Sequence, residues 1–345
     1  MPDTHAPENV QIVLASRPHG APTPENFRLE RVPVPSPGPD EVLLRTLYLS
    51  LDPYMRGRLS DAPSYAAPFE VDEPLGAGTV CEVVESNSDD VKVGDVVLAY
   101  TTWSTHAVAP AKAVRLVDPG RAPISTALGV LGMPGFTAYA GLAEIGRPTE
   151  GETVVVAAAS GPVGSLVGQL AQRSGARAVG IAGGPDKCAY LTEIGFDAAI
   201  DHRSPTFLDD LAAATPDGID VYFENVGGAV WDAVLERLND FARIPVCGLV
   251  ASYNDTGLPD GPDRMPALMG RVLRKRLHIQ GFIQSDFSSH LGDFHRTVGP
   301  MVAAGDVHYR EDVVDGLEAA PEAFIGMLEG RNFGKLVVKV GEPSA

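Results

Sequence analysis

One stretch of the chain decides its fold: Thr153-Val154-Val155-Val156-Ala157-Ala158-Ala159-Ser160-Gly161-Pro162-Val163-Gly164. Its first seven residues are all apolar apart from Thr153, which is typical of a strand buried on both faces of a parallel sheet. A helical pattern follows Gly164, and a helix N-terminus offers free N–H groups and a positive dipole end to a pyrophosphate. The stretch therefore predicts a dinucleotide-binding turn, although Ala159 stands where G-x-G-x-x-G has its first glycine. A tight turn that binds nothing is the alternative.

The segments after this stretch alternate between strands and helices. Apolar runs predict strands at residues 178–182, 198–200, 219–223, 242–246 and 277–282, and helical patterns occupy 164–174, 187–194, 207–214 and 230–238. Strands and helices that alternate in this way form a parallel sheet covered by helices on both faces. We therefore predict an α/β protein with a doubly wound, Rossmann-type parallel sheet.

The N-terminal part has a different pattern. Short strands are predicted at residues 10–14, 41–46, 78–85 and 95–100, with clusters of Pro, Gly and Asp between them, which is typical of a β-barrel-type lobe. A closing strand at 335–340 could return to complete that lobe. The predicted division is a first lobe over 1–125, a nucleotide-binding domain over 126–295, and a C-terminal return to the first lobe over 296–345.

The composition restricts the classes of protein to be considered. The chain has 345 residues, enough for two domains, and a formal net charge of −18. Such an acidic surface repels phosphate backbones and anionic membranes, so we expect no nucleic acid and no membrane as partners. The N-terminus lacks a basic segment followed by an apolar run, so we predict no secretory signal. No apolar stretch approaches the roughly 18–20 residues that a membrane-spanning helix needs.

The cysteines bear on both the compartment and the metal content. Cys81, Cys188 and Cys247 are scattered along the chain, which fits a reducing cytoplasm and gives no disulfide framework. Zinc alcohol dehydrogenases need thiolate, imidazole and carboxylate ligands that converge on the metal. None of the three cysteines has such a neighbour in the sequence, so we predict no metal site.

The residues after the second strand of the α/β domain indicate which cofactor it binds. An NAD site places Asp or Glu about 20 residues beyond the glycine turn, where the carboxylate holds the ribose hydroxyls. Here residues 181–185 are Ile-Ala-Gly-Gly-Pro, followed by Lys187, and His202-Arg203 follows the third strand. An acid would repel a 2′-phosphate and a lysine would pair with it, so the sequence favours NADPH. Asp186 is interpreted as a helix-start residue. Surface cations are the alternative interpretation of Lys187 and Arg203.

Several long stretches resemble a known family. Residues 47–58 are Leu-Tyr-Leu-Ser-Leu-Asp-Pro-Tyr-Met-Arg-Gly-Arg, which resembles the first-lobe signature of the leukotriene/prostaglandin reductase branch of the medium-chain dehydrogenase/reductases. That branch includes plant alkenal double-bond reductases and bacterial curcumin reductases. Further similar stretches are 132–139, 224–228, 243–248, 251–254, 261–264 and 332–335. The resemblance implies a GroES-like first lobe, a Rossmann second lobe, NADPH in the cleft between them, and a homodimer. It also implies NADPH-dependent reduction of an enone or enal.

The resemblance further implies roles for individual residues. The cofactor's phosphates would contact Ser160, Gly161, Val163, Gly164, Gly183, Lys187, His202 and Arg203. Its ribose and nicotinamide would lie near Pro53, Met133, Thr137, Asn225, Cys247, Gly248, Tyr253, Asn332 and the backbone of Phe282 and Ile283. Tyr54, Met133 and Tyr253 would contact the substrate. Many relatives have Tyr-Lys where this chain has His202-Arg203, and both pairs supply a ring and a cation.

The reaction itself says what such a site must contain. Hydride addition to the β-carbon of an enone moves negative charge onto the carbonyl oxygen, so a hydrogen-bond donor is needed there. The hydroxyl of Tyr253 is the candidate, with polarisation of the carbonyl as its first role, because tyrosine is a weak acid at neutral pH. The alternatives are a packed aromatic for Tyr253 and a hinge-shaping role for Tyr54. Two other functions stay open, a quinone reductase of the same superfamily and an NADPH-binding protein without turnover.

Overall fold

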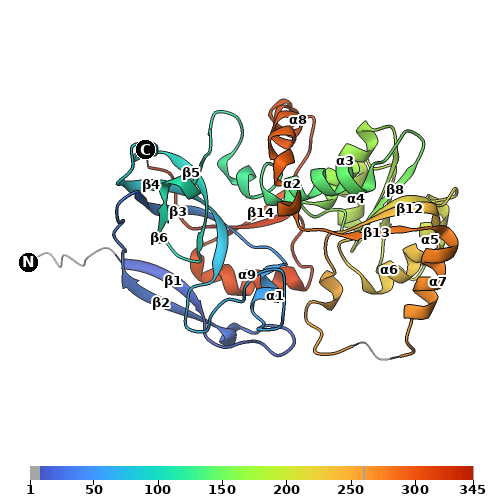
Figure 1. The fold of residues 1–345 in the computed structure, drawn as a ribbon, viewed down its shortest axis with the longest axis horizontal. Coiled ribbons are helices and arrows are strands. Elements are labelled where there is room, and N and C mark those ends of the chain that lie inside the picture. The colour runs from blue at the N-terminus through green and yellow to red at the C-terminus, as the bar shows by residue number, and fades with distance from the viewer. Residues whose placement is uncertain (1–7, 259–260, 345) are drawn as a thin grey trace, which may run out of the picture. The chain divides into compact units, whose positions relative to one another are not determined.

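The chain forms two compact units in the computed structural model, which describes residues 8–258 and 261–344 (Figure 1). The first unit contains the residues up to Leu128 and those from Glu311 onwards, and the second is Gly129–Arg310. Residues 296–310, which the sequence-based division gave to the C-terminal return, lie in the second unit. The predicted absence of a secretory signal rests partly on residues 1–7, which lie outside the described residues.

The second unit is built on a six-stranded sheet in the order β10-β9-β8-β11-β12-β13 (Figure 1). Its strands are β8 (Thr153–Val156), β9 (Arg177–Ala182), β10 (Ala198–Asp201), β11 (Ile219–Phe223), β12 (Leu238–Val246) and β13 (His278–Gly281). All neighbouring strands are parallel. The strand order reverses between β8 and β11, which is the topology of doubly wound dinucleotide-binding folds, so this prediction is confirmed. Ligands of such sheets bind outside the carboxyl ends of the strands at this switch point.

Helices cover both faces of this sheet (Figure 1). On one face lie α3 (Gly164–Arg173) and α4 (Pro185–Glu193), and on the other α5 (Phe207–Ala214), α6 (Gly228–Leu235) and α7 (Met265–Lys275). Apolar residues of α5 and α6 pack with Val155 and Val179 of the central strands in one buried cluster. The unit also contains α2 (Met133–Ala140), the π-helix η4 (Gly141–Gly146), η5 (Val250–Ser252), η6 (Gln284–His290) and α8 (Leu291–Ala304).

Two of the element boundaries that differ from the predicted ones have a clear physical reason. The strand predicted over 153–159 ends at Val156, because Ala158 adopts a left-handed backbone with a φ of 48° and turns the chain. The helix predicted over 230–238 ends at Leu235, and Leu238 already begins β12. Leu238 is fully buried and pairs with Ile219, so burial in the sheet overrides the helical pattern of the preceding residues.

The first unit is built mainly from antiparallel strands. Its larger sheet has the order β14-β15-β3-β4-β5-β7, with β6 paired to β3. The strands are β3 (Glu41–Ser50), β4 (Gly76–Ser86), β5 (Val96–Thr102), β6 (His106–Pro110), β7 (Arg115–Leu116), β14 (Glu311–Asp315) and β15 (Lys335–Lys339), and β1 (Glu8–Leu14) pairs separately with β2 (Phe27–Pro33). Its helices are η1 (Pro24–Asn26), α1 (Met55–Arg58), η2 (Ala111–Ala113), η3 (Ile124–Leu128), η7 (Leu317–Ala319) and α9 (Ala320–Leu328).

The C-terminal strand returns to the first unit, as predicted. β15 pairs antiparallel with β3 through Val337 and Ser50, and it pairs parallel with β14 on its other side. Beneath these strands, Trp103 is fully buried and stacks on Phe27 at a ring distance of 6.1 Å. Phe324 of α9 meets Trp103 edge-on at 6.0 Å. The chain's last segments thus supply part of the first unit's core.

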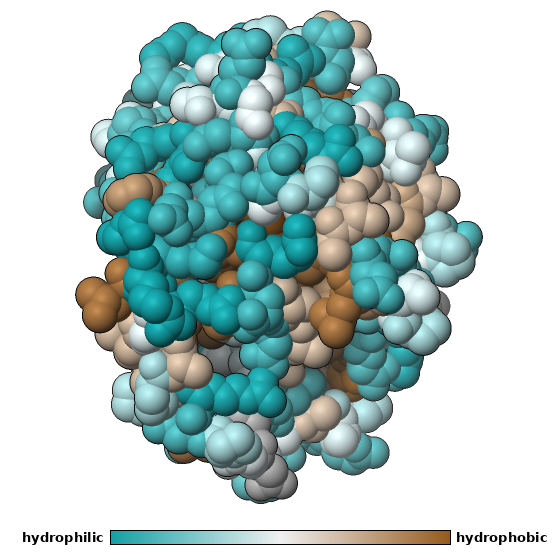
Figure 2. Space-filling view, turned by 90° about the vertical axis from the view of Figure 1, so that its right-hand side faces the viewer, coloured by the Kyte–Doolittle hydropathy of each residue, from teal (hydrophilic) through white to brown (hydrophobic). Residues whose placement is uncertain are grey.

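The face seen in Figure 2 is mostly hydrophilic, with hydrophobic patches between the polar side chains. Within residues 8–258 and 261–344, none of the helices has the length and apolar character needed to cross a bilayer.

Candidate functional site

The turn between β3 and α1 carries Pro53 and Tyr54. The Met55 N–H donates to the Asp52 carbonyl at 3.1 Å, and the Met55 side chain is buried in the core. The turn is therefore held both by a backbone hydrogen bond and by side-chain packing. Tyr54 is half-buried and packs against that core. Burial, and then the negative charge of Asp52, raises the pKa of the Tyr54 hydroxyl well above its usual value. The Tyr54 hydroxyl therefore stays protonated.

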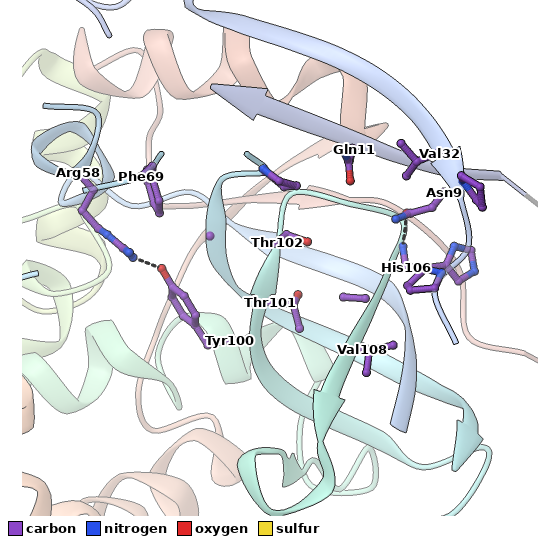
Figure 3. Close-up of a pocket in the computed structure, with 15 residues that line it drawn as sticks. Asn9, Gln11, Val32, Arg58, Phe69, Tyr100, Thr101, Thr102, His106 and Val108 are labelled. Carbon is purple, nitrogen blue, oxygen red and sulfur yellow. Dashed lines mark hydrogen bonds between the residues drawn. The ribbon is translucent and has the colours of Figure 1, made fainter. Parts of the chain in front are cut away.

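A groove of about 570 Å³ opens on the first unit (Figure 3). Arg58 of α1 borders it, with its guanidinium 4.1 Å from the centre of the Phe69 ring and hydrogen-bonded to the Tyr100 hydroxyl. Strands β5 and β6 supply polar residues such as Thr102 and His106 to the lining. None of the predicted site residues lines this groove, so it is distinct from the pocket that the resemblance implies.

Asn332 lies in the loop between α9 and β15. Its amide donates to the Gly334 carbonyl at 2.8 Å, and the Gly334 N–H donates to the Asp312 carboxylate at 3.2 Å. The loop ends at Lys335, whose buried ammonium donates to Asp52 Oδ1 at 2.8 Å. Asp52 and Lys335 were not among the predicted site residues.

The glycine turn follows β8 and leads into α3. The Gly161 N–H donates to the Ala158 carbonyl at 3.1 Å, and the Ser165 N–H donates to the Gly161 carbonyl at 3.0 Å. A Cβ on Gly164 would lie 2.6 Å from the Ala158 carbonyl oxygen and 2.7 Å from the Ala159 Cα, so only glycine fits there without a backbone shift. The close approach brings the start of α3 to the carboxyl end of β8. This turn therefore has the backbone geometry that a pyrophosphate site requires.

The predicted phosphate-end residues meet at the carboxyl ends of β9 and β10. A Cβ on Gly183 would lie 2.9 Å from both Arg203 Nε and His202 Nε2, so these side chains lie against Gly183. Burial, and then the charge of Arg203, lowers the pKa of His202, and Lys187 acts in the same direction. The structure thus brings two cations and a neutral imidazole together. This arrangement suits an anionic group.

The carboxylate of Asp201, directly before His202, accepts hydrogen bonds from the backbone. Asp201 Oδ1 accepts the N–H groups of Gly184 and Arg203, each at 2.9 Å, and these bonds hold the Asp201 pKa below its usual value. Asp186 lies in the first turn of α4, as predicted for a helix-start residue. The Asp201 carboxylate therefore shapes the loop after β10. It is not the acid of an NAD site, which lies at the end of the second strand.

A third group of predicted residues gathers where β11 and β12 end. The Asn225 amide donates to the Ala157 carbonyl at 2.8 Å, which ties it to the end of β8. The N–H groups of Cys247 and Gly248 donate to the Glu224 carbonyl at 2.9 and 3.2 Å. The Leu249 N–H donates to the Tyr253 hydroxyl at 3.4 Å, and a Cβ on Gly248 would lie 3.2 Å from that hydroxyl. The structure therefore brings Asn225, Cys247, Gly248 and Tyr253 together.

Burial keeps the acidic side chains of this group protonated. It raises the pKa of the Cys247 thiol to about 12, with a further contribution from the charge of Glu224. The Cys247 side chain is therefore a neutral thiol and not a nucleophile. Burial also raises the pKa of Tyr253. The phenol is therefore neutral at physiological pH. It accepts the Leu249 N–H, and within residues 8–258 and 261–344 no acceptor takes its own hydrogen.

Glu224 is a buried carboxyl that the sequence interpretation overlooked. Its side chain accepts the Val226 and Gly227 N–H groups at 2.6 and 2.9 Å and lies 3.0 Å from the Tyr222 hydroxyl. It is 1% exposed, and burial raises its pKa despite these bonds. The signal was an acid directly after an apolar strand and before two glycines. Its bonds shape the loop that carries Asn225.

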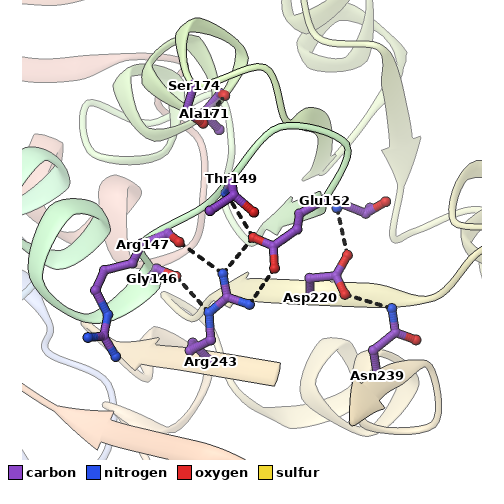
Figure 4. A network of polar contacts seen from close by, with 10 residues as sticks. Gly146, Arg147, Thr149, Glu152, Ala171, Ser174, Asp220, Asn239 and Arg243 are labelled. Atoms are coloured by element: carbon purple, nitrogen blue, oxygen red, sulfur yellow. Dashed lines mark hydrogen bonds and ion pairs between the residues drawn. The ribbon is translucent and has the colours of Figure 1, made fainter. Parts of the chain in front are cut away.

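Strand β12 is held to its neighbours by Arg243, in its second half (Figure 4). Its guanidinium bonds both carboxylate oxygens of Glu152, at 2.8 and 2.6 Å, and the carbonyls of Gly146 and Arg147 at 2.9 and 3.0 Å. This planar, bidentate pair lowers the pKa of Glu152. It joins the end of η4 and the start of β8 to β12, the strand that leads to Cys247.

The remaining predicted residues have mixed surroundings. Met133 is the exposed first residue of α2, and the Thr137 hydroxyl donates to its carbonyl at 2.8 Å. Phe282 is buried edge-on against Phe223, at a ring distance of 6.2 Å, and its N–H donates to the Val246 carbonyl at 3.4 Å. The Ile283 N–H donates to Asp286 at 2.9 Å and is occupied by that turn.

A doubly wound sheet with a glycine turn at its switch point, together with a β-rich unit completed by the C-terminal strand, defines a two-unit dinucleotide-binding protein. Two family models match the chain, one described as N-terminal domain of oxidoreductase over residues 10–117 and one as zinc-binding dehydrogenase over 162–298. Although the second description names zinc, the described part of the chain holds no group of three or more His, Cys, Asp or Glu residues placed to bind a metal ion.

Individual relatives match over nearly the whole chain. The NADPH-dependent curcumin reductase of Escherichia coli (strain K12) is 56% identical, covering 96% of this chain and 97% of the relative. The 2-alkenal reductase (NADP(+)-dependent) of Nicotiana tabacum is 39% identical, covering 96% and 97%. The crystal structure of CurA from Vibrio vulnificus in complex with NADPH superposes with a TM-score of 0.93 at 53% identity, covering 97% of this chain and 100% of that one. The chain therefore belongs to the medium-chain dehydrogenase/reductases, in the zinc-independent branch of the leukotriene/prostaglandin reductases. The predicted fold class is confirmed.

Proposed function

We propose that this protein uses NADPH to reduce the carbon–carbon double bond of α,β-unsaturated ketones or aldehydes. The observation that carries the proposal is the neutral, half-buried hydroxyl of Tyr253 beside Gly248, at the carboxyl end of the sheet. The printed names of the relatives, a curcumin reductase and a 2-alkenal reductase, support this reaction and this cofactor.

The residues present suit NADPH. The glycine turn would hold the pyrophosphate through the backbone of residues 160–164, and Lys187 and Arg203 would pair with the 2′-phosphate beside Gly183 and His202. We assign the ribose and nicotinamide contacts to Pro53, Met133, Thr137, Asn225, Cys247, Gly248, Asn332 and the backbone of Phe282 and Ile283.

When bound, NADPH supplies the hydride that adds to the β-carbon of the substrate. The Tyr253 hydroxyl would donate a hydrogen bond to the carbonyl oxygen, where negative charge develops, and such a donor is worth roughly 2.7–4 kcal/mol in the barrier. Because burial raises its pKa, Tyr253 is a better hydrogen-bond donor than proton source at neutral pH. Tyr54 and Met133 would contact the rest of the substrate.

Absorbance loss of the reduced nicotinamide tests this function, with NADPH and NADH in parallel, on a 2-alkenal, an aryl enone and a quinone. We expect NADPH-dependent saturation of the enones. Turnover of the quinone alone would identify a quinone reductase, and NADPH binding without turnover would identify a non-catalytic binding protein.

Gly164 offers a test of the phosphate site. Gly164→Ala should weaken NADPH binding by about tenfold and destabilise the unit by about 1–3 kcal/mol, because its Cβ would collide with the backbone of Ala158 and Ala159. Fluorescence titration and thermal unfolding measure the two effects. Gly299→Ala in α8 is the control, since no heavy atom lies within 4 Å of its added Cβ, and it should be neutral or slightly stabilising. Equal behaviour of the two variants would contradict the assignment.

A homodimer is part of the proposal and would use the edge of the parallel sheet. β13 is one of the two edge strands of this sheet, and all its residues are exposed. The adjoining helix α7 exposes Met265, Met269 and Leu273 at helical spacing. Leu273 is 78% exposed, so Leu273→Glu should convert the dimer to a monomer in sedimentation velocity. A wild-type monomer would refute the dimer.

The three free cysteines agree with a reducing cytoplasm as the location of this protein.

A further inference from the structure

We propose that the buried ion pair of Lys335 and Asp52 is a positioning device that holds two loops of the site, those of Tyr54 and Asn332, in a fixed relation. The inference rests on the proposed function, because the family resemblance assigns Tyr54 to the substrate and Asn332 to the cofactor. It adds two residues to which the resemblance gave no role.

The pair is enclosed and its bonds are directional. Lys335 Nζ donates to Asp52 Oδ1 at 2.8 Å and to the Leu51 carbonyl at 2.7 Å. The two side chains are only 3% and 7% exposed. The Ser50 hydroxyl donates to the other carboxylate oxygen, Oδ2. Each carboxylate oxygen therefore has its own donor, which leaves the Asp52 side chain one orientation.

Both loops join the sheet at this pair, where the Tyr54 loop begins and the Asn332 loop ends. Asp52 directly precedes Pro53 and Tyr54, and its carbonyl accepts the Met55 N–H at the start of α1. On the other strand, Lys335 is the first residue of β15 and directly follows the Asn332 loop. The Leu51 N–H also donates to the Leu336 carbonyl at 3.2 Å. The ion pair thus closes the gap between the strands at the point where the two loops leave the sheet.

The Asn332 loop is also held from its other side. The carboxylate of Asp312 in β14 accepts the N–H groups of Phe333 and Gly334, the latter at 3.2 Å. Lys335 fixes the end of the loop, and Asp312 fixes the residues directly after Asn332. The position of Asn332 relative to β15 is therefore restricted. Its amide points back to the Gly334 carbonyl at 2.8 Å.

Stability alone does not require charges here. A buried ion pair can often be replaced by apolar residues of similar volume with no loss of stability, because the desolvation of two charges offsets their attraction. What the charged pair adds is direction, through bonds between defined atoms. A change that removes both charges should therefore disturb the loops more than the sheet.

The test compares a double variant with a matched control. Lys335→Met with Asp52→Leu removes both charges and leaves none unpaired. Arg45→Met with Glu82→Leu removes a cross-strand pair from β3 and β4 of the same sheet. We expect the first variant to bind NADPH about tenfold more weakly, as for the loss of one oriented bond. Its affinity for adenosine 2′,5′-bisphosphate, which lacks the nicotinamide, should change by less than about twofold. Its kcat on a 2-alkenal should fall by about tenfold.

The control should leave all three quantities unchanged. Equal weakening of both ligands would indicate general loosening and overturn the inference, as would unchanged NADPH affinity in a folded double variant. If the double variant does not fold, Lys335→Gln with Asp52→Asn removes both charges and keeps polar side chains of similar shape, and it should show the same selective loss on a smaller scale. A wild-type protein that binds NADPH but reduces no enone would defeat the proposed function and leave the ratio of the two dissociation constants to decide this inference.

Discussion

Replacing Tyr253 with phenylalanine is expected to lower kcat for enone reduction by about 10²–10³-fold, with less than about twofold change in the Kd for NADPH. The variant removes the hydroxyl beside Gly248 and keeps the ring that packs there. The oxyanion that develops on the substrate would then lose its preorganised donor. Steady-state kinetics measure kcat, and fluorescence titration measures the Kd.

Tyr139→Phe is the matched control, since it removes a tyrosine hydroxyl from the same unit, on α2, where the ring packs on Phe294. It should leave kcat unchanged. An unchanged kcat in Tyr253→Phe would exclude Tyr253 from the chemistry. Because burial raises the Tyr253 pKa, kcat of the wild type should show no alkaline decline from this group below about pH 10.

Replacing Lys187 with alanine is expected to raise the KM for NADPH by about 10- to 100-fold and that for NADH by less than about twofold, because a charged hydrogen bond to the 2′-phosphate is worth about 1.5–3 kcal/mol. Lys187 lies with Arg203 near His202, at the carboxyl ends of β9 and β10. Only NADPH carries the phosphate that this corner would bind. Parallel titrations of the two cofactors in steady-state assays give both constants.

Lys187→Arg keeps the charge and should retain most of the preference for NADPH. The effect of Lys187→Ala should shrink as ionic strength rises, because the corner is partly open to solvent. Equal changes in the two KM values would remove Lys187 from the 2′-phosphate site. In that case Arg203 alone would be the candidate partner of the phosphate.

Local patterns were enough to predict the second unit. The run from Thr153 and the glycines after it identified the central strand and the turn, because a strand buried on both faces must be apolar and a close backbone approach must use glycine. The absence of an acid from residues 181–185, at the end of β9, depends only on nearby residues, and so does the helix start at Asp186. These features were accessible because neighbours in sequence determine them.

Features that depend on distant residues were not predicted. Lys335 and Asp52 are 283 positions apart, and nothing in either local sequence indicates that they pair. The sequence around Ala158 is that of a strand, yet its backbone is left-handed because the turn has to enter α3. The bonds of Glu224 to the backbone likewise exist only once the loop after β11 has formed.

The return of β15 to the first unit has a consequence for the order in which a newly made chain can fold. All strands of the parallel sheet precede residue 311 and are contiguous, so that unit can form while the C-terminus is still in the ribosome. One edge of the second half of β3 has to wait for β15, which follows every other described strand in the chain. A chain truncated before residue 335 would keep its nucleotide-binding fold but expose this open edge of β3, which is a template for aggregation. Incomplete products should therefore be recognisable to proteases by their first unit.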